Sequence, residues 1–319
     1  MTLPSVIDAI GGSPLVELSR LSKALDLEGR LLAKLDYLLP GFSKKDRAAR
    51  AIVEAARASG DLHPGQPVVE LTSGNMGTGL AIVCGVMGHP FVAVMSRGNS
   101  PERASMMRAL GAEVIIVEQA NGSVEGSVSG ADLALVEEAA QAICADRDAF
   151  RADQFTRDGN PSAHESGTAP EIWEASNGEL SAFCDFVGSG GTLGGCARFF
   201  APRGVRCYAV EPVGAEALSQ GDLSKPGHPI QGGGYLMADL RHLHSAELSG
   251  NLTVTGEDAK AHARLLARHE GIFGGFSGGA NLAAAVQLLR GPEHGGTIAF
   301  VVCDSGLKYL STDLWEDTP

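Results

Sequence analysis

The stretch at residues 67–83, PVVELTSGNMGTGLAIV, passes from a strand through a glycine-containing loop into a helix. Residues 67–71 form an apolar run of strand length with two adjacent valines, and the residues from Leu80 onward are apolar in the manner of a buried helix. Between them, residues 72–77 supply two hydroxyls, one amide and a flexible backbone where the chain turns. A strand that leads directly into a helix-opening loop begins a β-α-β unit, so parallel pairing with the next strand is expected.

The same alternation of strand and helix continues on both sides of this unit. Strands are expected at residues 29–35, 67–71, 91–95, 113–117, 182–187, 205–210 and 297–303, and helices near 131–146, 164–173, 257–269 and 282–289. The loops that follow parallel strands meet at one edge of a sheet, where open α/β folds bind their ligands. The sequence therefore predicts an α/β protein with mostly parallel sheets and a site at their carboxyl edges.

A second stretch, LPGFSKKDR at residues 39–47, places two lysines where a helix is expected to begin. Pro40 and Gly41 break the chain, and Ser43 with Asp46 has the spacing of a capping box. The helix dipole disfavours a cation at this end, which lowers the cost of the neutral amine, the nucleophilic form of lysine. These residues alone leave two interpretations open, a pair of solvated lysines or a reactive lysine.

The loop GSGGT at residues 188–192 has the composition of an anion-binding site. It follows an apolar strand and opens a helix, so its backbone N–H groups can surround a phosphate. A dinucleotide site is an alternative, because Gly188 and Gly190 begin a GxGxxG pattern and Glu211 lies where an acid that binds ribose is expected. Leu193 occupies the position of the third glycine in that pattern. A purely structural turn also stays open.

Two further segments carry polar groups at the ends of expected strands. Residues 72–77 offer hydroxyl, amide and backbone donors that suit a carboxylate. The alternative is an ordinary capped helix, in which Ser73 or Asn75 is only the cap. Ser305 follows a buried strand and either ends it in a turn or offers its hydroxyl to a ring nitrogen.

Composition excludes several classes of protein. The 319 residues, 44% of them hydrophobic, are enough for two domains, and 25 Lys and Arg against 38 Asp and Glu give a net charge of −13. Without a basic cluster, nucleic-acid binding is not expected. The six cysteines are scattered with no CxxC pair, so we expect thiols and no metal site. No signal-peptide pattern or membrane-length apolar run is present, so we expect a cytoplasmic protein without a membrane partner.

Eight sequence blocks in a fixed order together resemble one enzyme family. They read IGGSPLVEL, PGFSKKDR, TSGNMG, DQF…NPSAH…APEIW, GSGGTLGG, IQGGGY, EGIFGGFSGGA and DSGLKYLS. This order resembles the cysteine synthase and cystathionine β-synthase branch of the pyridoxal-phosphate enzymes, which have the tryptophan synthase β-like fold (fold type II). The resemblance implies pyridoxal 5′-phosphate as cofactor and two α/β domains, each with a twisted, mostly parallel sheet flanked by helices. The smaller, mobile domain would be residues 40–147, and the larger, phosphate-binding domain residues 1–39 plus 148–319.

The resemblance also implies a role for each motif residue. Lys45 would form the covalent bond to the cofactor and act as the catalytic residue, while Lys44 would stay solvated. The cofactor would further be bound by Asn75 at its phenolic oxygen, by Ser305 at its pyridine nitrogen, and at its phosphate by Gly188, Ser189, Gly190, Gly191 and Thr192. The substrate would be bound by Thr72, Ser73, Met76 through its backbone N–H, Gln154, Gly232 and Tyr235.

The implied reaction is β-replacement on an activated L-serine such as O-acetylserine. A neutral hydroxyl at the pyridine nitrogen makes the ring a weaker electron sink than a carboxylate would, which favours loss of a β-substituent. The reaction would pass through an aminoacrylate, with sulfide as nucleophile and L-cysteine as product, in a homodimer, the usual state in this family. The alternatives within the family are β-elimination by a dehydratase or ammonia lyase, and cystathionine-type synthesis with a larger nucleophile. A nicotinamide-dependent oxidoreductase and a cofactor-binding scaffold without activity are the alternatives from other classes.

Five residues depart from the pattern of an acetylserine-using cysteine synthase. Met76 stands where threonine is usual, Leu39 replaces an asparagine, Phe42 a glycine and Gly278 a serine. Tyr235 stands where acetylserine-using cysteine synthases often have alanine and cystathionine β-synthases have tyrosine. These departures concern the donor and the nucleophile rather than the cofactor.

Overall fold

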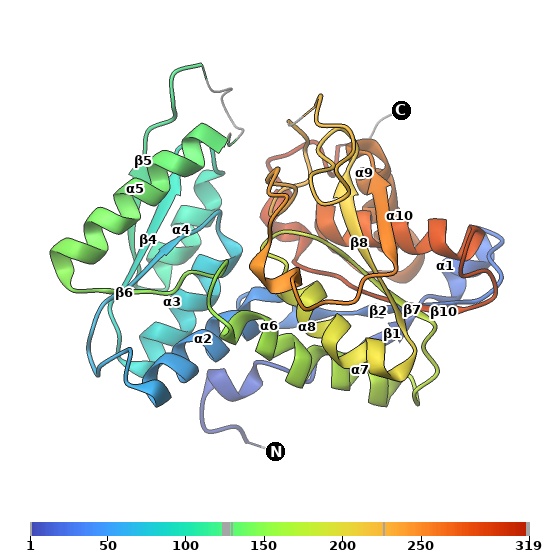
Figure 1. Cartoon of the computed structure of the whole chain (residues 1–319), viewed down its shortest axis with the longest axis horizontal. Coiled ribbons are helices and arrows are strands. Elements are labelled where there is room, and N and C mark those ends of the chain that lie inside the picture. Colours follow the sequence, from blue (N-terminus) through green and yellow to red (C-terminus); the bar gives the residue numbers. More distant parts are fainter. Residues whose placement is uncertain (1, 123–127, 129, 226, 317–319) are drawn as a thin grey trace. The chain divides into compact units, whose positions relative to one another are not determined.

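The computed structural model describes residues 2–122, 128, 130–225 and 227–316, and the chain divides into two compact units, each with its own sheet (Figure 1). Unit 1 comprises Met1–Ile10, Leu39–Gly41 and Lys45–Asn160, and unit 2 comprises Gly11–Leu38, Phe42–Lys44 and Pro161–Pro319. The chain therefore passes from unit 2 to unit 1 between the two adjacent lysines. The predicted boundaries of a mobile domain stay a prediction.

Unit 1 is built on a four-stranded parallel sheet in the order β5-β4-β3-β6. Its strands are β3 (Val68–Leu71), β4 (Phe91–Ser96), β5 (Glu113–Val117) and β6 (Phe150–Arg151). β3 and β4 are buried along nearly their whole length, as expected for parallel strands covered on both faces. Val69 pairs with Val92 on one side and with Arg151 on the other, which fixes the register at the centre of the sheet.

Helices cover both faces of this sheet. They are α2 (Lys45–Ser59), α3 (Asn75–Met87), α4 (Pro101–Ala109) and α5 (Gly130–Arg147), with the short η1 (Val6–Ala9). α2 packs against α3, and a Cβ added at Gly79 would lie 3.1 Å from the Ala49 Cβ, so a glycine lets the two helices approach closely. On the other face, Val136 and Ala140 of α5 pack with Val69 and Val92. Unit 1 is thus a sheet between two layers of helices.

Unit 2 is built on a six-stranded sheet in the order β1-β2-β10-β7-β8-β9. Its strands are β1 (Leu15–Glu17), β2 (Arg30–Lys34), β7 (Ala182–Phe186), β8 (Arg206–Pro212), β9 (Gly250–Val254) and β10 (Thr297–Val301). Only β1 is antiparallel to its neighbour among these strands. β7 and β10 are adjacent and parallel, so the chain leaves both at the same edge.

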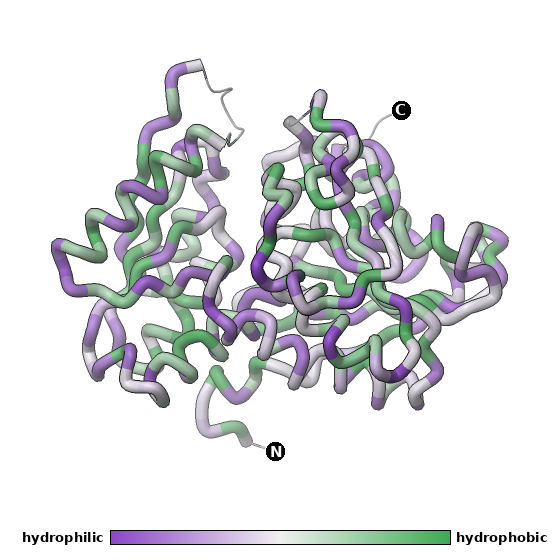
Figure 2. The backbone as a smooth tube through the Cα atoms, viewed as in Figure 1, coloured by the Kyte–Doolittle hydropathy of each residue, from purple (hydrophilic) through white to green (hydrophobic). Residues whose placement is uncertain are grey.

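The helices of unit 2, together with α6 at its boundary with unit 1, pack around this second sheet. They are α1 (Ser19–Ala24), α6 (Gly159–Ala163), α7 (Ala169–Ala175), α8 (Gly191–Phe200), α9 (Gly256–Leu265) and α10 (Phe276–Arg290), and two π-helical turns cover His164–Thr168 and Leu266–Glu270. Short 3-10 turns lie at η2 (Asp36–Leu38), η4 (Ala201–Arg203), η5 (Arg241–Leu243) and η7 (Gly306–Tyr309). Figure 2 shows hydrophobic residues concentrated along the central strands of each unit.

The two mostly parallel sheets flanked by helices confirm the predicted fold class. The helix expected at residues 282–289 already begins at Phe276, because Gly278 and Gly279 allow close packing on Val302 and on α9. The predicted capping box is wrong: α2 begins at Lys45, and in the described structure the buried Ser43 hydroxyl has no hydrogen-bond partner. Asp46 instead accepts the Gly41 N–H at 2.5 Å and thereby turns the chain into the helix.

Candidate active site

In unit 1, the two predicted substrate-binding segments follow neighbouring parallel strands. Residues 72–77 follow β3, and Gln154 lies shortly after β6, which pairs with β3. The Thr72 Oγ1 accepts the N–H groups of Gly74 at 3.0 Å and of Gly77 at 2.9 Å, so its oxygen shapes the loop while its O–H proton can be donated to a ligand. The sheet thus brings both segments to one edge.

The start of α3 has the features of an anion-binding helix terminus. Its N-cap is Gly74, at φ 133°, so the interpretation of Ser73 or Asn75 as the N-cap residue is wrong, and the first-turn N–H of Gly77 donates to the Thr72 Oγ1 instead. Asn75 is the first helical residue and half-buried, and the Ser73 carbonyl accepts Arg103 Nη1 at 2.6 Å. The side chain of Met76 lies in the core of unit 1, and its backbone N–H belongs to the first turn of the helix. The N-terminus of this helix favours a carboxylate.

Lys45 is hydrogen-bonded to Gln154, one of the predicted substrate-binding residues. The Lys45 Nζ donates to the Gln154 Oε1 at 2.9 Å, and Lys45 itself is half-buried. The backbone N and the Nε2 of Gln154 both lie 3.4 Å from the Oε1 of Glu70, which is fully buried and paired with Arg151. Burial raises the pKa of the Glu70 carboxyl, and the Arg151 guanidinium opposes that rise. The buried Glu70 thus orients Gln154, and Gln154 orients Lys45.

In unit 2, the loop at residues 188–192 forms a cradle of backbone groups. Its Gly190 is the N-cap of α8 at φ 81°, and the helix start lacks a side-chain cap among the described residues. A Cβ added at Gly188 would lie 2.5 Å from the Gly232 carbonyl oxygen, so only glycine fits there. The Thr192 Oγ1 lies 3.2 Å from the Nε2 of the buried His164, which fixes the first turn of the helix. Uncapped N–H groups at a helix start fit a phosphate dianion.

Ser305 follows β10, the strand adjacent to β7, and one of its two predicted roles is visible in the structure. Its Oγ accepts the Leu307 N–H at 3.3 Å, which confirms that it ends the strand in a turn. Its own N–H donates to the Phe42 carbonyl at 3.1 Å, so the segment before Lys45 lies alongside the end of β10. The Ser305 hydroxyl proton can still be donated, and its role at a ring nitrogen stays a prediction.

The prediction that Lys44 is solvated is wrong. Lys44 is only 7% exposed, and its Nζ lies 2.7 Å from both carboxylate oxygens of Asp185 on β7. Burial alone would lower the pKa of the Lys44 ammonium, but the Asp185 charge outweighs burial and raises the pKa above its usual value. Lys44 is therefore held as an ammonium by Asp185 and is not available as a nucleophile.

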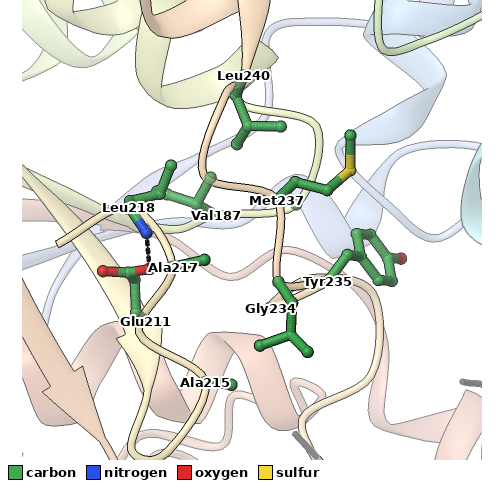
Figure 3. Close-up of a pocket in the computed structure, with 11 residues that line it drawn as sticks. Val187, Glu211, Ala215, Ala217, Leu218, Gly234, Tyr235, Met237 and Leu240 are labelled. Carbon is green, nitrogen blue, oxygen red and sulfur yellow. Dashed lines mark hydrogen bonds between the residues drawn. The ribbon is translucent and has the colours of Figure 1, made fainter. Parts of the chain in front are cut away.

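The loop from Gly232 to Tyr235 lies beside the phosphate-type loop and lines a pocket. The Gly234 N–H donates to the Val187 carbonyl at 3.0 Å, and Tyr235 is half-buried at the pocket (Figure 3). The lining is otherwise mostly apolar and comprises Val187, Gly188, Glu211, Ala215, Ala217, Leu218, Gly234, Leu236, Met237 and Leu240. The structure thus brings the predicted residues Gly188, Gly232 and Tyr235 together.

Glu211 does not have the role that a dinucleotide site would give it. Its carboxylate accepts the N–H of Leu218 at 2.6 Å and of Ser219 at 3.0 Å, and the first of these bonds is visible in Figure 3. Both oxygens therefore close a loop of the protein, and the ribose-binding interpretation of this acid is wrong.

Other kinds of site find little support in the described part of the chain. No cluster of His, Cys, Asp and Glu there is arranged to hold a metal ion, and no helix there is long and apolar enough to cross a membrane. The six cysteines are free thiols, and burial raises the pKa of the Cys303 thiol to about 12. A thiol with this pKa is protonated at neutral pH and is a poor nucleophile.

Comparison with known proteins identifies the family. The family described as "Pyridoxal-phosphate dependent enzyme" matches residues 6–304. This chain belongs to that family. "Cysteine synthase 3" of Caenorhabditis elegans is 37% identical over 316 residues, which cover 97% of this chain and 89% of that protein.

Solved structures agree with this assignment. O-acetyl serine sulfhydrylase isoform 3 from Entamoeba histolytica superimposes with a TM-score of 0.89 at 31% identity, covering 100% of this chain and 93% of that one. An O-ureido-L-serine synthase superimposes with a TM-score of 0.87 at 33% identity, covering 100% and 97%. The chain is a pyridoxal-phosphate dependent enzyme of fold type II, and the predicted resemblance and cofactor are confirmed.

Several residues that support the site are not predicted from the sequence. They are Glu70, Arg151, His164, Asp185 and Asn281, the last of which donates from its Nδ2 to the Asp185 Oδ1 at 3.2 Å. A signal exists for two of them, because Glu70 in VVEL and Asp185 in AFCDF are acids inside apolar strands. A buried carboxylate is costly unless it is paired, so each implies a partner, although the sequence does not show which one.

Proposed function

We propose that this enzyme is a cysteine synthase, which replaces the β-substituent of an O-acetyl-L-serine-like donor with sulfide and releases L-cysteine and acetate. The single observation that carries the proposal is the 2.9 Å hydrogen bond from the Lys45 Nζ to Gln154, which follows the strand paired with the one that leads into residues 72–77. A lysine amine is thus held next to groups suited to an amino-acid carboxylate. Relatives named cysteine synthase and O-acetyl serine sulfhydrylase support the choice of donor and nucleophile.

The residues of both units fit the cofactor. In unit 1, Lys45 would bind it covalently and Asn75 would donate to its phenolic oxygen. In unit 2, Ser305 would donate to its ring nitrogen, and its phosphate would be bound by Gly188, Ser189, Gly190, Gly191 and Thr192. When bound, pyridoxal phosphate withdraws electrons from the α-carbon of an amino acid, which makes the α-proton acidic and lets a β-substituent leave.

The protein's own groups then bind the substrate and move a proton. The donor carboxylate would be bound by Thr72, Ser73, the Met76 N–H and Gln154, with the α3 dipole favouring its negative charge. The Lys45 Nζ, released from the cofactor, would take the α-proton and later return it. Its hydrogen bond to Gln154 supports this role, because the Nζ is already within reach of a carboxylate-binding side chain.

One observation favours a second candidate, a nucleophile larger than sulfide. Tyr235 lines the pocket beside Gly188, and Gly232 packs on Gly188 through its carbonyl. A relative of comparable similarity is named O-ureido-L-serine synthase, so product identity varies among such proteins. Removal of the β-substituent without replacement is the remaining alternative within the family.

Three properties beyond the chemistry are part of the proposal. We propose a homodimer, the usual state in the family, to be tested by light scattering. We propose a cytoplasmic location, which is supported by six free thiols, five of them buried. We also propose that residues 40–147 form the part that moves on substrate binding.

The experiment that tests the function is a product assay in the presence and in the absence of sulfide. The purified holoenzyme is given O-acetyl-L-serine with and without sulfide, and cysteine, acetate and pyruvate are measured. The proposal expects cysteine to form in step with acetate only when sulfide is present, and Lys45→Ala to abolish both. Pyruvate formed equally in both conditions would instead establish β-elimination. Donor loss that requires another nucleophile would favour the second candidate.

A further inference from the structure

A buried ion pair involves the strand that leads into the loop at residues 188–192, the proposed phosphate-binding loop. Lys44 and Asp185 are 7% and 2% exposed, and the Lys44 Nζ contacts both Asp185 oxygens at 2.7 Å. Asp185 lies on β7, three positions before Gly188. Lys44 is bonded to Lys45, the residue proposed to hold the cofactor.

The pair belongs to a network that ties three segments together. The Lys44 N–H donates to the Cys303 carbonyl at 2.8 Å, two residues before Ser305. The Asn281 Nδ2 on α10 donates to the Asp185 Oδ1 at 3.2 Å and to the Val301 carbonyl at 2.9 Å, and its Oδ1 accepts the Phe186 N–H at 2.6 Å. The segment before Lys45, the end of β7 and the end of β10 are therefore joined through side chains of this network.

Burial of such a pair is not explained by stability alone. Removing two charges from water costs free energy that their attraction often does not return, and apolar residues of similar volume commonly serve the fold as well. What an ion pair adds is a fixed geometry, because one arrangement satisfies both groups while others leave a buried charge unpaired. The segments that this geometry fixes all continue into residues of the proposed cofactor site.

We propose that the Lys44–Asp185 ion pair is a positioning device for pyridoxal phosphate. It holds the peptide that leads into Lys45 against the strand ends that lead into the phosphate loop and into Ser305. This inference rests on the proposed function only in assigning the cofactor contacts to Lys45, to residues 188–192 and to Ser305. Lys44 and Asp185 act through these residues and are not themselves catalytic.

A simple field effect makes a different prediction. Lys44→Met leaves a buried negative charge and Asp185→Asn a buried positive charge, both near the site of a phosphate dianion. A field effect would weaken cofactor binding in the first variant and strengthen it in the second. Loss of positioning weakens binding in both.

The experiment measures the dissociation constant of pyridoxal phosphate for Lys44→Met, Asp185→Asn and the double variant, by titrating each full-length apoprotein and following visible absorption. Lys23→Met, which removes an exposed lysine charge of the same unit, is the matched control. We expect at least a tenfold weaker binding in both single variants, with a shifted absorption maximum of the bound cofactor, and no change in the control. Melting temperatures of the apoproteins are measured alongside.

The double variant separates positioning from stability. It carries no unpaired buried charge, so we expect its melting temperature to recover while its cofactor binding stays at least tenfold weaker than in the wild type. Double-variant binding equal to the wild type, opposite shifts in the two single variants, or unchanged binding in both would each overturn the proposal. If the single variants do not fold, the double variant alone decides. Failure of the proposed function would look different, because the wild type would then bind no cofactor or Lys45→Ala would keep the bound absorption band.

Discussion

Two glycine loops, at residues 72–77 in unit 1 and 188–192 in unit 2, begin helices in the same way but are supported differently. Both use a glycine N-cap at positive φ, Gly74 at 133° and Gly190 at 81°. In unit 2, the Gly232 backbone carbonyl fills the space beside Gly188 and the His242 carbonyl that beside Gly194 in the following helix, while Gly190 faces the Leu243 side chain. Backbone carbonyls of packed segments cannot rotate away, so we expect the start of this loop to be rigid around the phosphate that we propose it binds.

The loop in unit 1 is surrounded by side chains instead. The Arg103 Cδ would lie 2.6 Å from a Cβ added at Gly74, and the Met107 sulfur lies against Gly77 together with the Thr72 methyl group. Long side chains can change rotamer, which lets the loop adjust when a substrate binds. From this difference we expect the loop at residues 188–192, the proposed cofactor anchor, to be fixed and the loop at residues 72–77, the proposed substrate loop, to be adaptable.

The largest expected effect comes from breaking the rigid loop. Gly188→Ala places a Cβ 2.5 Å from the Gly232 oxygen, a clash that we expect to cost about 3 kcal/mol and to lower pyridoxal phosphate affinity about 100-fold. Titration of the apoprotein measures this effect. Gly227→Ala is the control, because a Cβ there meets open space. Equal pyridoxal phosphate affinities of the two variants would show that the loop is not rigid around the phosphate.

A glycine-to-alanine substitution in the loop at residues 72–77 is expected to change the KM for the donor rather than the affinity for the cofactor. In Gly77→Ala, Met107 can move, so we expect cofactor affinity to be unchanged and the KM for the donor to rise about tenfold, or about 1.4 kcal/mol. Met107→Ala in the same chain should restore part of the loss. Steady-state kinetics and cofactor titration together check this prediction, and a loss of cofactor affinity as large as that of Gly188→Ala would remove the distinction between the loops.

Acid pH is expected to affect the substrate side through Glu70. Burial raises the pKa of this carboxyl above its unfolded value of about 4.3, so the folded protein takes up the proton first as the pH falls. Glu70 therefore costs stability above its raised pKa, and the wild type should gain stability relative to Glu70→Gln as the pH falls through that value. Urea unfolding of both proteins from pH 8 to pH 5 measures the difference. A loss of wild-type stability relative to Glu70→Gln as the pH falls would contradict the sign.

Glu70 should also make the KM for the donor depend on pH. Its protonation weakens the pairing with Arg151 and the hold on Gln154, so we expect the KM of the wild type to rise in acid. Glu70→Gln should show a flatter profile. An equally steep profile in both proteins would place the titrating group elsewhere.

The smallest expected effect concerns the segment just before the two lysines. Phe42 is 44% exposed and has φ 61°, a left-handed conformation that costs a residue with a Cβ about 1 kcal/mol or more. Phe42→Gly removes this strain but adds flexibility to the unfolded chain, so we expect a net stabilisation of about 0.5 kcal/mol. Urea unfolding measures it. A clear destabilisation would show that the ring makes contacts that outweigh the strain.

The fold could be predicted from the sequence because local signals agree with each other. Apolar runs of strand length are followed by glycine loops and apolar helices, and β3, β4, β7 and β10 all lie where these runs predict them. The phosphate-type loop was visible for the same reason, since its glycines stand between a strand and a helix.

The support beneath the site could not be predicted, because it depends on contacts between distant residues. Lys44 looks like a solvated lysine until the fold brings Asp185, 141 positions away, to its Nζ. Thr192 likewise depends on His164, and Gln154 on Glu70. The sequence shows that a buried acid needs a partner but not which one, so these pairings require the folded structure.

The measurement that tests the central claim most directly is the identity of the lysine that binds the cofactor. The holoenzyme is reduced with borohydride, digested, and analysed by mass spectrometry for the phosphopyridoxyl group. We expect the label on Lys45, with Lys44 unmodified, because Lys44 is held as an ammonium by Asp185 while Lys45 contacts Gln154. A label on Lys44, or on any other lysine, would contradict the assignment of the active site and the mechanism that depends on it.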